Sequence, residues 1–305
     1  MTVISHISGA AGVKATTSTV TSGSVTAAAG DWVIASVINT ASGTLPNTPT
    51  ASGLTFNAIG TALANGSNCS CGIYVAVAGG SFSGTVTATI TSGTQMGIWV
   101  DVFRGGIQSS LLDTQASNTA TSNTTGSNAS PTPGFNNELM VSVLAASAAT
   151  ASGTISGFWT LSSNAGSTAI TAGLSGYSIE GTASVNAPTF GWTTSHPYAC
   201  LTVALKPQPR ITSVSPNTGT TGTSVTITGT NLTTSGASGV KFGTNNATSY
   251  TMTSDTSITN AIVPAGGSTV DVIVNATGIG NTTIEPSDQF TYTGGGASGG
   301  FMGYM

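Results

Sequence analysis

Histidines and carboxylates decide which reactions a chain can catalyse, and both are scarce in this sequence. There are two histidines, His6 and His196, and the strands around them could bring them together or hold them apart. A hydrolytic triad needs a serine, a histidine and an aspartate within hydrogen-bond distance. Serine is so frequent here that no nucleophile stands out. The pattern therefore predicts two edge histidines and no triad.

Carboxylates give an equally weak signal for catalysis. Glycoside hydrolysis needs two of them facing one cleft, about 5 to 10 Å apart. Only three glutamates occur, Glu138, Glu180 and Glu285, and Glu138 and Asp101 lie at the ends or in the middle of predicted strands. Asp31 with Asp101 is the one candidate Ca²⁺ pair, but no dense loop of Asp, Asn and Glu surrounds it. We predict no enzyme activity, no catalytic residues, no cofactor and no metal.

Aromatic rings offer the most serious binding chemistry, because their flat apolar faces stack on sugars. Trp32 and Trp99 lie inside alternating strands, where core packing is expected. Trp159 and Trp192 border turns rich in Gly and Ser, and Tyr198 lies near Trp192 in the sequence. Trp159, Trp192 and Tyr198 are therefore the predicted ligand-binding residues.

The cysteines Cys69, Cys71 and Cys200 are odd in number, and their spacing fits no standard zinc site. A bridge between Cys69 and Cys71 would be strained in an extended strand, because alternate residues lie about 6 to 7 Å apart. Buried or half-buried free thiols are expected.

Charge and hydropathy exclude further classes of function. Of 305 residues only 5% are charged and the net charge is -4, so nothing supports binding to nucleic acid phosphates. A mean hydropathy of +0.24 indicates a folded chain. The first twenty residues lack the features of a secretory signal, and no apolar stretch is long enough to span a membrane. These patterns predict a chain made in a cytoplasm that does not insert into membranes.

Period-two alternation dominates the first two thirds of the chain and predicts an all-β sandwich of about ten or more antiparallel strands. The clearest strands are expected at 31–40, 71–80, 84–91, 96–105, 138–147 and 198–207. The polar tract 113–137 has almost no apolar residue and contains Pro131 and Pro133. It is expected to be an extended surface connection, serving either as a contact loop or only as a crossover.

A domain boundary is predicted at KPQPR, residues 206–210, after which Trp disappears from the sequence. The expected domains are 1–207 and 208–292, followed by a Gly-rich tail at 293–305. The tail ends in large apolar side chains, and we expect it to act as an assembly anchor. The anchor residues are Phe301, Met302, Tyr304 and Met305.

The second predicted domain carries an ordered set of motifs that together resemble the IPT/TIG family of immunoglobulin-like domains. They are ITSVSP at 211–216, Gly219, GTSVTITGTNL at 222–232, VKFGTNNA at 240–247, SDTSITNAIVPA at 254–265, VDVIV at 270–274 and FTY at 290–292. Leu232 departs from the family, which usually has an aromatic residue there. The resemblance implies a β-sandwich.

The residues of the opening motif support that sandwich independently. Val225 and Ile227 alternate with threonines, which predicts one buried face and one hydroxylated face. Gly219, Gly222 and Gly229 are expected to allow tight turns, and Pro216 to close a strand edge.

The first predicted domain resembles, at the level of pattern, concanavalin- or laminin-G-like jelly-roll modules of phage structural proteins and bacterial surface proteins. The motifs are GDWVIASV at 30–37, SGLTFNAIG at 52–60, CGIYVAVAGG at 71–80, GTVTATIT at 84–91, IWVDVFRG at 98–105, NELMVSVLA at 137–145 and FGWTTSHPYACLTVALKP at 190–207. The resemblance implies a jelly-roll β-sandwich followed by an immunoglobulin-like sandwich.

From these resemblances we expect a non-enzymatic virion structural protein of a tailed phage, acting as head decoration, head fibre or tail-associated fibre, with weak adhesion to host surface glycans. Its expected partners are capsid or tail proteins and further copies of itself, with a trimer as one option. A bacterial surface adhesin or filament subunit at the cell surface is the alternative. A carbohydrate-binding module or enzyme is the third hypothesis.

Overall fold

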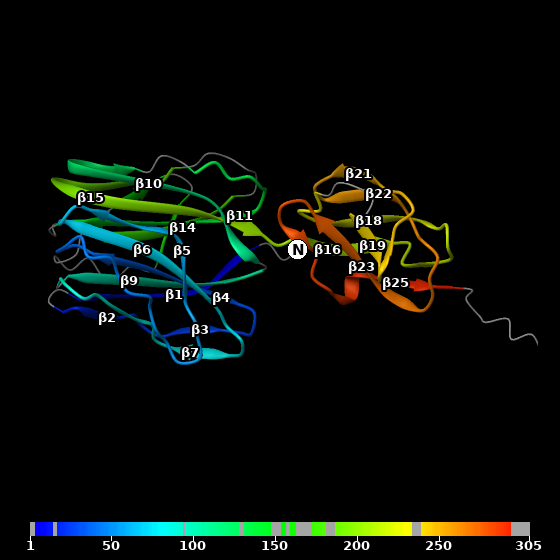
Figure 1. Ribbon diagram of the computed structural model, residues 1–305, viewed down its shortest axis with the longest axis horizontal. Helices are drawn as coiled ribbons and strands as arrows, with labels where there is room; N and C mark the ends of the chain where they lie inside the picture. Colours follow the sequence, from blue (N-terminus) through cyan, green and yellow to red (C-terminus); the bar gives the residue numbers. More distant parts are fainter. Residues whose placement is uncertain are drawn as a thin grey trace, which may run out of the picture. The chain divides into compact units, whose positions relative to one another are not determined.

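The structure is a computed structural model, and it describes residues 4–14, 17–93, 95–105, 107–127, 131–147, 154–156, 159–162, 173–180, 187–233 and 239–293. It confirms an all-β protein (Figure 1). The chain divides into two compact units, one formed by Thr2–Pro207 and one by Gln208–Met305. Among the residues described, no helix has the length and hydrophobicity of a membrane span.

Residues 5–104 of the first unit build one five-stranded antiparallel sheet. Its strands, in spatial order, are β1 (Ser5–Lys14), β9 (Met96–Arg104), β4 (Trp32–Asn39), β6 (Cys69–Val77) and β5 (Asn57–Asn65). Numbered along the chain, the five strands therefore lie in the order first, fifth, second, fourth, third.

Residues 107–207 build a second antiparallel sheet with the same order of strands. In space they are β10 (Ile107–Ser127), β15 (Thr189–Pro207), β11 (Glu138–Ala146), β14 (Gly173–Glu180) and β13 (Thr160–Leu161), with β12 (Thr154–Ser156) pairing to β15. When β12 is left out of the count, the order is again first, fifth, second, fourth, third. We call residues 4–104 the first repeat and 107–207 the second repeat.

The two repeats also agree in strand register. One row of neighbouring residues crosses all five strands in each sheet, Gly9–Asp101–Ile34–Val75–Asn57 in the first repeat and Gln115–Val203–Val141–Tyr177–Thr160 in the second. Both first strands also carry a bulge at the same place. In β1 it falls between His6 and Ser8, and in β10 between Leu112 and Thr114. The agreement therefore extends to a local irregularity that strand order alone does not require.

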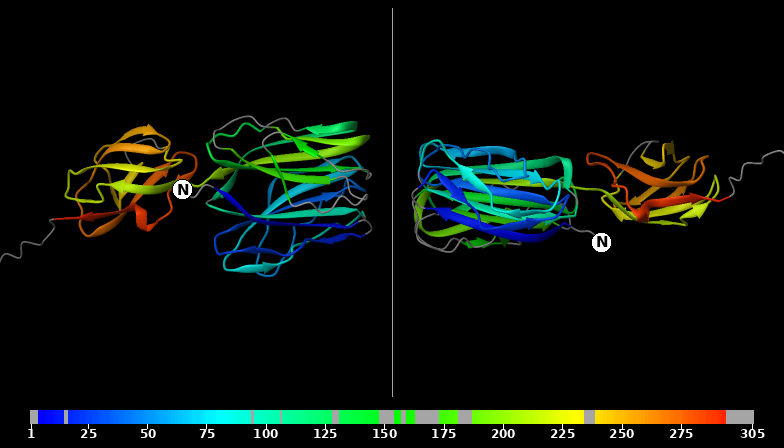
Figure 2. Two further views of the ribbon diagram at one scale, coloured as in Figure 1. Left: turned by 180° about the vertical axis from the view of Figure 1, so that it is seen from behind. Right: turned by 90° about the horizontal axis from the view of Figure 1, so that it is seen from below.

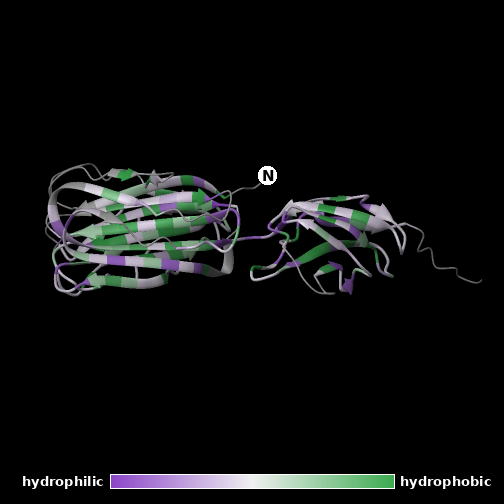
Figure 3. Ribbon diagram, turned by 90° about the horizontal axis from the view of Figure 1, so that it is seen from above, coloured by the Kyte–Doolittle hydropathy of each residue, from purple (hydrophilic) through white to green (hydrophobic). Residues whose placement is uncertain are grey.

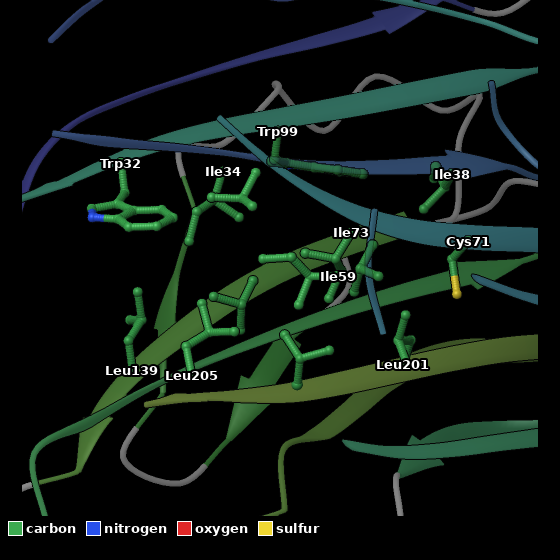
Figure 4. Close-up of a cluster of buried hydrophobic side chains, with 14 of the residues drawn as sticks. Trp32, Ile34, Ile38, Ile59, Cys71, Ile73, Trp99, Leu139, Leu201 and Leu205 are labelled. Atoms are coloured by element: carbon green, nitrogen blue, oxygen red, sulfur yellow. The ribbon is translucent and has the colours of Figure 1, made fainter. Parts of the chain in front are cut away.

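The main core of the first unit lies between the two sheets. Alternate side chains of each strand point inward, so that Trp32, Ile34 and Trp99 of the first repeat face Leu139 and Leu205 of the second (Figure 4). All five are at least nine-tenths buried. Burial of each such side chain contributes about 1.5 to 3 kcal/mol, so each repeat depends on the other for much of its stability.

A further layer covers the outer face of the first sheet. The short strands β2 (Thr19–Thr21), β3 (Val25–Ala27), β7 (Phe82–Gly84) and β8 (Thr87–Thr89) form two pairs, β2 with β8 and β3 with β7. They lie on the side of the first sheet away from the second (Figures 1 and 2). Val33, Val37 and Val102 are fully buried beneath them. This layer explains why β4 is buried on both faces.

The second unit is a two-sheet sandwich. One sheet has the order β16 (Arg210–Ser215), β18 (Ser224–Thr230), β22 (Ser257–Ile262) and β21 (Thr251–Ser254). The other has the order β17 (Thr218–Gly219), β25 (Gln289–Tyr292), β23 (Thr269–Ala276), β19 (Val240–Phe242) and β20 (Asn245–Asn246), with β24 (Gly280–Asn281) on β23. A short 3₁₀ helix, η1 (Pro286–Asp288), precedes β25.

The core of the second unit confirms the alternation read in β18. Val225 and Ile227 are buried, and the rings of Phe242 and Phe290 meet edge to face with centroids 5.5 Å apart. Leu232 is fully buried in this core, so its aliphatic side chain fills the position. In both units, hydrophobic residues concentrate in the strands (Figure 3).

Two details of the expected fold are corrected. The tract 113–137 is not a connecting loop over its first half, because β10 runs to Ser127 and pairs with β15 along its length. Of the three predicted turn glycines, only Gly222 has a positive φ, +88°. Gly219 and Gly229 instead lie in strands where a Cβ would overlap Thr223 and the carbonyl oxygen of Arg210, so the requirement there is for space.

Candidate functional site

A groove on the outer layer of the first repeat is a concave site formed by described residues. Its volume is about 580 Å³, which falls within the usual range for small-ligand sites. It is lined by Thr50, Ala51, Ser52, Ser81, Phe82, Ser83, Gly84, Thr85 and Thr87. It lies entirely within the first unit.

Short strands and one tight turn position the lining residues. Thr50 and Thr87 exchange two backbone hydrogen bonds of 2.8 and 2.9 Å. The next turn closes where Leu54 donates to the Ala51 carbonyl at 3.3 Å, with Gly53 at a φ of +80°. On the opposite side β7 presents Phe82, which is partly buried against the outer core. One aromatic ring therefore lies among hydroxyl groups.

The groove contains no ionisable side chain among its lining residues. Serine and threonine hydroxyls donate and accept hydrogen bonds, and the ring of Phe82 adds an apolar surface. This combination suits a neutral ligand rich in hydroxyl groups. It offers nothing that would recognise a phosphate, a metal ion or a charged peptide.

The aromatic residues predicted to bind a ligand are not brought together in this groove. Trp159 is only 7% exposed and packs on Met140 and Ala204, and Tyr198 is 2% exposed. The Tyr198 hydroxyl accepts a hydrogen bond from Asn118 at 3.0 Å. Neither ring has an open face, so their assignment as sugar platforms is corrected on grounds of burial. Trp192 belongs to β15, but its side chain lies outside the described residues.

His6 lies on β1, the edge strand of the first sheet, as expected, but its ring is only partly exposed because it has two close partners. Its Nε2 lies 2.8 Å from Oδ1 of Asp101, and its ring stacks on Tyr177 with centroids 4.7 Å apart. In the second sheet Tyr177 lies opposite Val141, and Val141 lies opposite Val203. The ring of His6 is therefore at the level of Val203. His196 precedes Val203 by seven residues on β15, which is about 23 Å along a strand. The two histidines therefore do not meet.

The two aspartates proposed as a Ca²⁺ pair have separate partners. Asp31 receives two hydrogen bonds from Arg104, both of 2.7 Å, while Asp101 contacts His6. The guanidinium of Arg104 lowers the pKa of Asp31. In the part of the chain that the structure describes, no group of three His, Cys, Asp or Glu residues is placed to hold a metal.

The three cysteines are free and buried, as predicted. Burial raises the pKa of the Cys69 thiol to about 12 and that of Cys71 well above its ordinary value. Thiolate chemistry at neutral pH is therefore suppressed. The tail residues Phe301, Met302, Tyr304 and Met305 lie outside the described residues.

Sequence reasoning missed both the groove and the contact of His6 with Asp101. The groove segments TPTASG and SFSGT differ little from many other Ser, Thr and Gly stretches of the chain, so nothing marked them. His6 and Asp101 are 95 residues apart in sequence and meet only because β1 pairs with β9. The repeated strand order was the one signal that could have placed β1 beside β9, and so His6 beside Asp101.

Comparison with known families finds a match for the second unit. Residues 209–292 match the model of the IPT/TIG domain. The match spans nearly all the described residues of that unit and does not extend into the first. No curated protein matches the chain in sequence. An immunoglobulin-like domain of this kind fits a surface or adhesion-type protein.

Proposed function

We propose, from the IPT/TIG match over residues 209–292, that this chain is a non-enzymatic structural protein displayed on the virion of a tailed phage. It serves there as head decoration, head fibre or tail-associated fibre, and it adheres weakly to host surface glycans. The observation that carries the proposal is the joining of this immunoglobulin-like domain to an all-β unit with an uncharged, hydroxyl-lined groove.

The surface chemistry supports display rather than catalysis. Only 5% of the residues are charged, so serine and threonine hydroxyls must solvate much of the outer face. Such a surface allows copies to crowd on a particle without strong repulsion between like charges. Among the described residues, the one His–Asp contact is stacked against Tyr177, and the groove holds no acid or base.

The groove supplies the adhesive element of the proposal. Hydroxyl groups of Thr50, Ser52 and Ser83 hydrogen bond to a neutral sugar, and the Phe82 ring packs on its apolar face. A shallow site of this kind binds weakly. Display of many copies raises the avidity of weak contacts without requiring a deep pocket.

A bacterial surface adhesin or filament subunit is the alternative, because an IPT/TIG domain fits that class equally well. A carbohydrate-binding module is the third candidate, favoured by the same groove. The three candidates differ in where the chain is found and in whether it is fixed to a particle.

Mass spectrometry of purified phage particles tests the proposal, followed by imaging of particles that carry either the full chain or a chain without residues 293–305. Abundance in particles, with loss of the truncated chain, supports a virion protein anchored by its tail. Recovery of the chain only in cell-envelope fractions would overturn the virion assignment and favour the adhesin.

A further inference from the structure

The acidic residues at the N-terminal ends of β4 and β11 occupy equivalent positions in the two repeats. Asp31 directly precedes β4 and Glu138 begins β11, and each follows a residue with positive φ, Gly30 at +84° and Asn137 at +61°. Asp31 Oδ2 accepts the amide of Ala28 at 2.8 Å. Glu138 Oε1 accepts the amide three residues before it, also at 2.8 Å. Both acids therefore close the same kind of turn.

The two repeats differ in what neutralises the acid. In the first repeat, Arg104 donates to both oxygens of Asp31, at 2.7 Å each. The matching position in the second repeat is Lys206, because Phe103 and Leu205 pair with equivalent residues of β4 and β11. Glu138 is fully buried, and its Oε2 has no hydrogen-bond partner among the described residues. An unsatisfied buried carboxylate oxygen is costly, so a positive charge or a proton is needed there.

Asp113 is the second carboxyl group near Glu138 Oε2. It is the extra residue of the β10 bulge, where the first repeat has Ile7. Its Oδ2 accepts the Gly134 amide at 2.8 Å, and Glu138 Oε1 accepts the amide of Phe135, the next residue in the same turn. One turn therefore holds a carboxyl group from β10 and another from β11 side by side.

We propose that Asp113 and Glu138 share one proton, and that this proton acts as a clasp that fastens β10 and the turn at residues 134–135 to the start of β11. Two carboxylates held by adjacent amides, one of them fully buried, cannot both ionise without strong repulsion. A bridging proton replaces that repulsion with a short, charge-assisted hydrogen bond. It also gives Glu138 Oε2 the partner that it otherwise lacks.

Two further charged residues lie on the strands that flank Glu138. Lys206 lies at the matching position on β15, and Glu180 of β14 is directly opposite Glu138 in the register and is buried. Burial, followed by the charge of Asp113, raises the pKa of Glu138 to about 8. Full ionisation would leave both Asp113 and Glu138 negative within one turn. The clasp therefore opens in mildly alkaline solution.

The sign of the pH effect follows from linkage. The folded chain holds the Glu138 proton more tightly than the unfolded chain, whose glutamate pKa is near 4.5. The free energy of unfolding therefore falls as the pH rises from about 5 to about 8, and this contribution is constant at higher pH. An ordinary paired carboxylate such as Asp31 contributes in the opposite direction.

Denaturation of the full-length chain with urea, repeated from about pH 5 to about pH 10, tests the clasp by comparing wild type, Glu138→Gln and the control Glu180→Gln. The Glu138→Gln amide donates permanently to Asp113, so this variant should lose the decline in stability that wild type and the control show between pH 5 and pH 8. Parallel curves for wild type and Glu138→Gln would overturn the proposal.

A second variant keeps the test open if Glu138→Gln fails to fold. Asp113→Asn removes the neighbouring negative charge and donates to Glu138, so the decline should move to lower pH. An unchanged decline would contradict the clasp. Thermal unfolding at alkaline pH with CaCl₂ or with EDTA provides a further check. Stabilisation of wild type by Ca²⁺ that is absent in Glu138→Gln would show that the pair holds a metal ion, which also overturns the proposal.

Discussion

At the residue scale, the face of the strand decides the role of each aromatic side chain. Phe56 directly precedes β5, and Trp159 directly precedes β13, the equivalent third strand of the second repeat. Phe56 packs against the outer core that contains Val33, and Trp159 packs on Met140, the matching residue of β11. Trp159 is thus the counterpart of a core phenylalanine. Its position beside Gly and Ser turns gave no sign of this burial.

Replacement of Trp159 by alanine should therefore act on stability. We expect the free energy of unfolding to fall by about 3 to 5 kcal/mol, as for other buried aromatic residues, and Phe56→Ala to behave similarly. Urea denaturation of both variants measures the loss. A loss below about 1 kcal/mol, together with weaker binding to sugars, would show instead that the ring is a binding platform.

The groove makes a separate prediction about binding. Ser83 is exposed and lines the groove, whereas Ser24 is exposed outside it. Ser83→Arg should fill the groove with a charged side chain and weaken binding to neutral glycans on an array by about tenfold or more, or about 1.4 kcal/mol. Ser24→Arg should bind like wild type. Equal binding by all three proteins would exclude the groove as the glycan site.

At the element scale, close packing of strands depends on glycines at particular places. A Cβ on Gly12 of β1 would overlap the carbonyl oxygen of Thr21 in β2. The obstacle is backbone, so it cannot rotate away as a side chain would. Gly79, after β6, has open space where a Cβ would lie, with no atom within 4 Å, and serves as the matched control.

Gly12→Ala should therefore lower the free energy of unfolding by about 1 to 3 kcal/mol. Gly79→Ala should change it by no more than about 0.5 kcal/mol. Chemical denaturation of the two variants beside wild type measures both effects. Equal stability of Gly12→Ala and wild type would mean that β2 does not lie as close to β1 as described.

Much of this secondary structure could be predicted from the sequence, because the central strands are rich in apolar and β-branched residues. β4, β6, β9 and β11 are buried along nearly their whole length, and their runs of apolar residues predict them as strands. β10 could not be predicted in the same way, because its residues from Gln115 to Ser127 are mostly polar. It is a strand because β15 pairs with it, with several register shifts, from Ile107 to Ser127, which is a tertiary cause.

The candidate sites were less predictable than the strands, for a related reason. The Asp113–Glu138 pair depends on a bulge, and the His6–Asp101 contact depends on register between strands far apart in sequence. The repeat itself leaves little sequence identity, since Asp101 matches Val203 and Val75 matches Tyr177. Matching residues retain only the side of the sheet to which their side chains point. A single sequence does not show that correspondence.

At the scale of the whole molecule, the chain contains two units with separate cores. Leu139 lies in the core between the sheets of the first unit, and Ile227 in the core of the second unit. Neither cluster includes residues of the other unit. Each unit should therefore unfold as a cooperative body of its own.

Calorimetry of the full chain should accordingly resolve two transitions. Leu139→Ala should destabilise one of them by about 2 to 5 kcal/mol, and Ile227→Ala should destabilise the other by a similar amount. A single transition that both substitutions shift together would show that the two units fold as one.

The two repeated sheets of the first unit determine how its stability responds to dilution of the protein. If the two sheets belonged to separate chains, burial of Trp32, Leu139 and their neighbours between them would produce a dimer. The stability of that dimer would depend on protein concentration. Here both sheets belong to one chain, so their effective concentration is fixed by the short connection between Arg104 and Ile107. The core of the first unit should persist in a single molecule, however far its neighbours are diluted away.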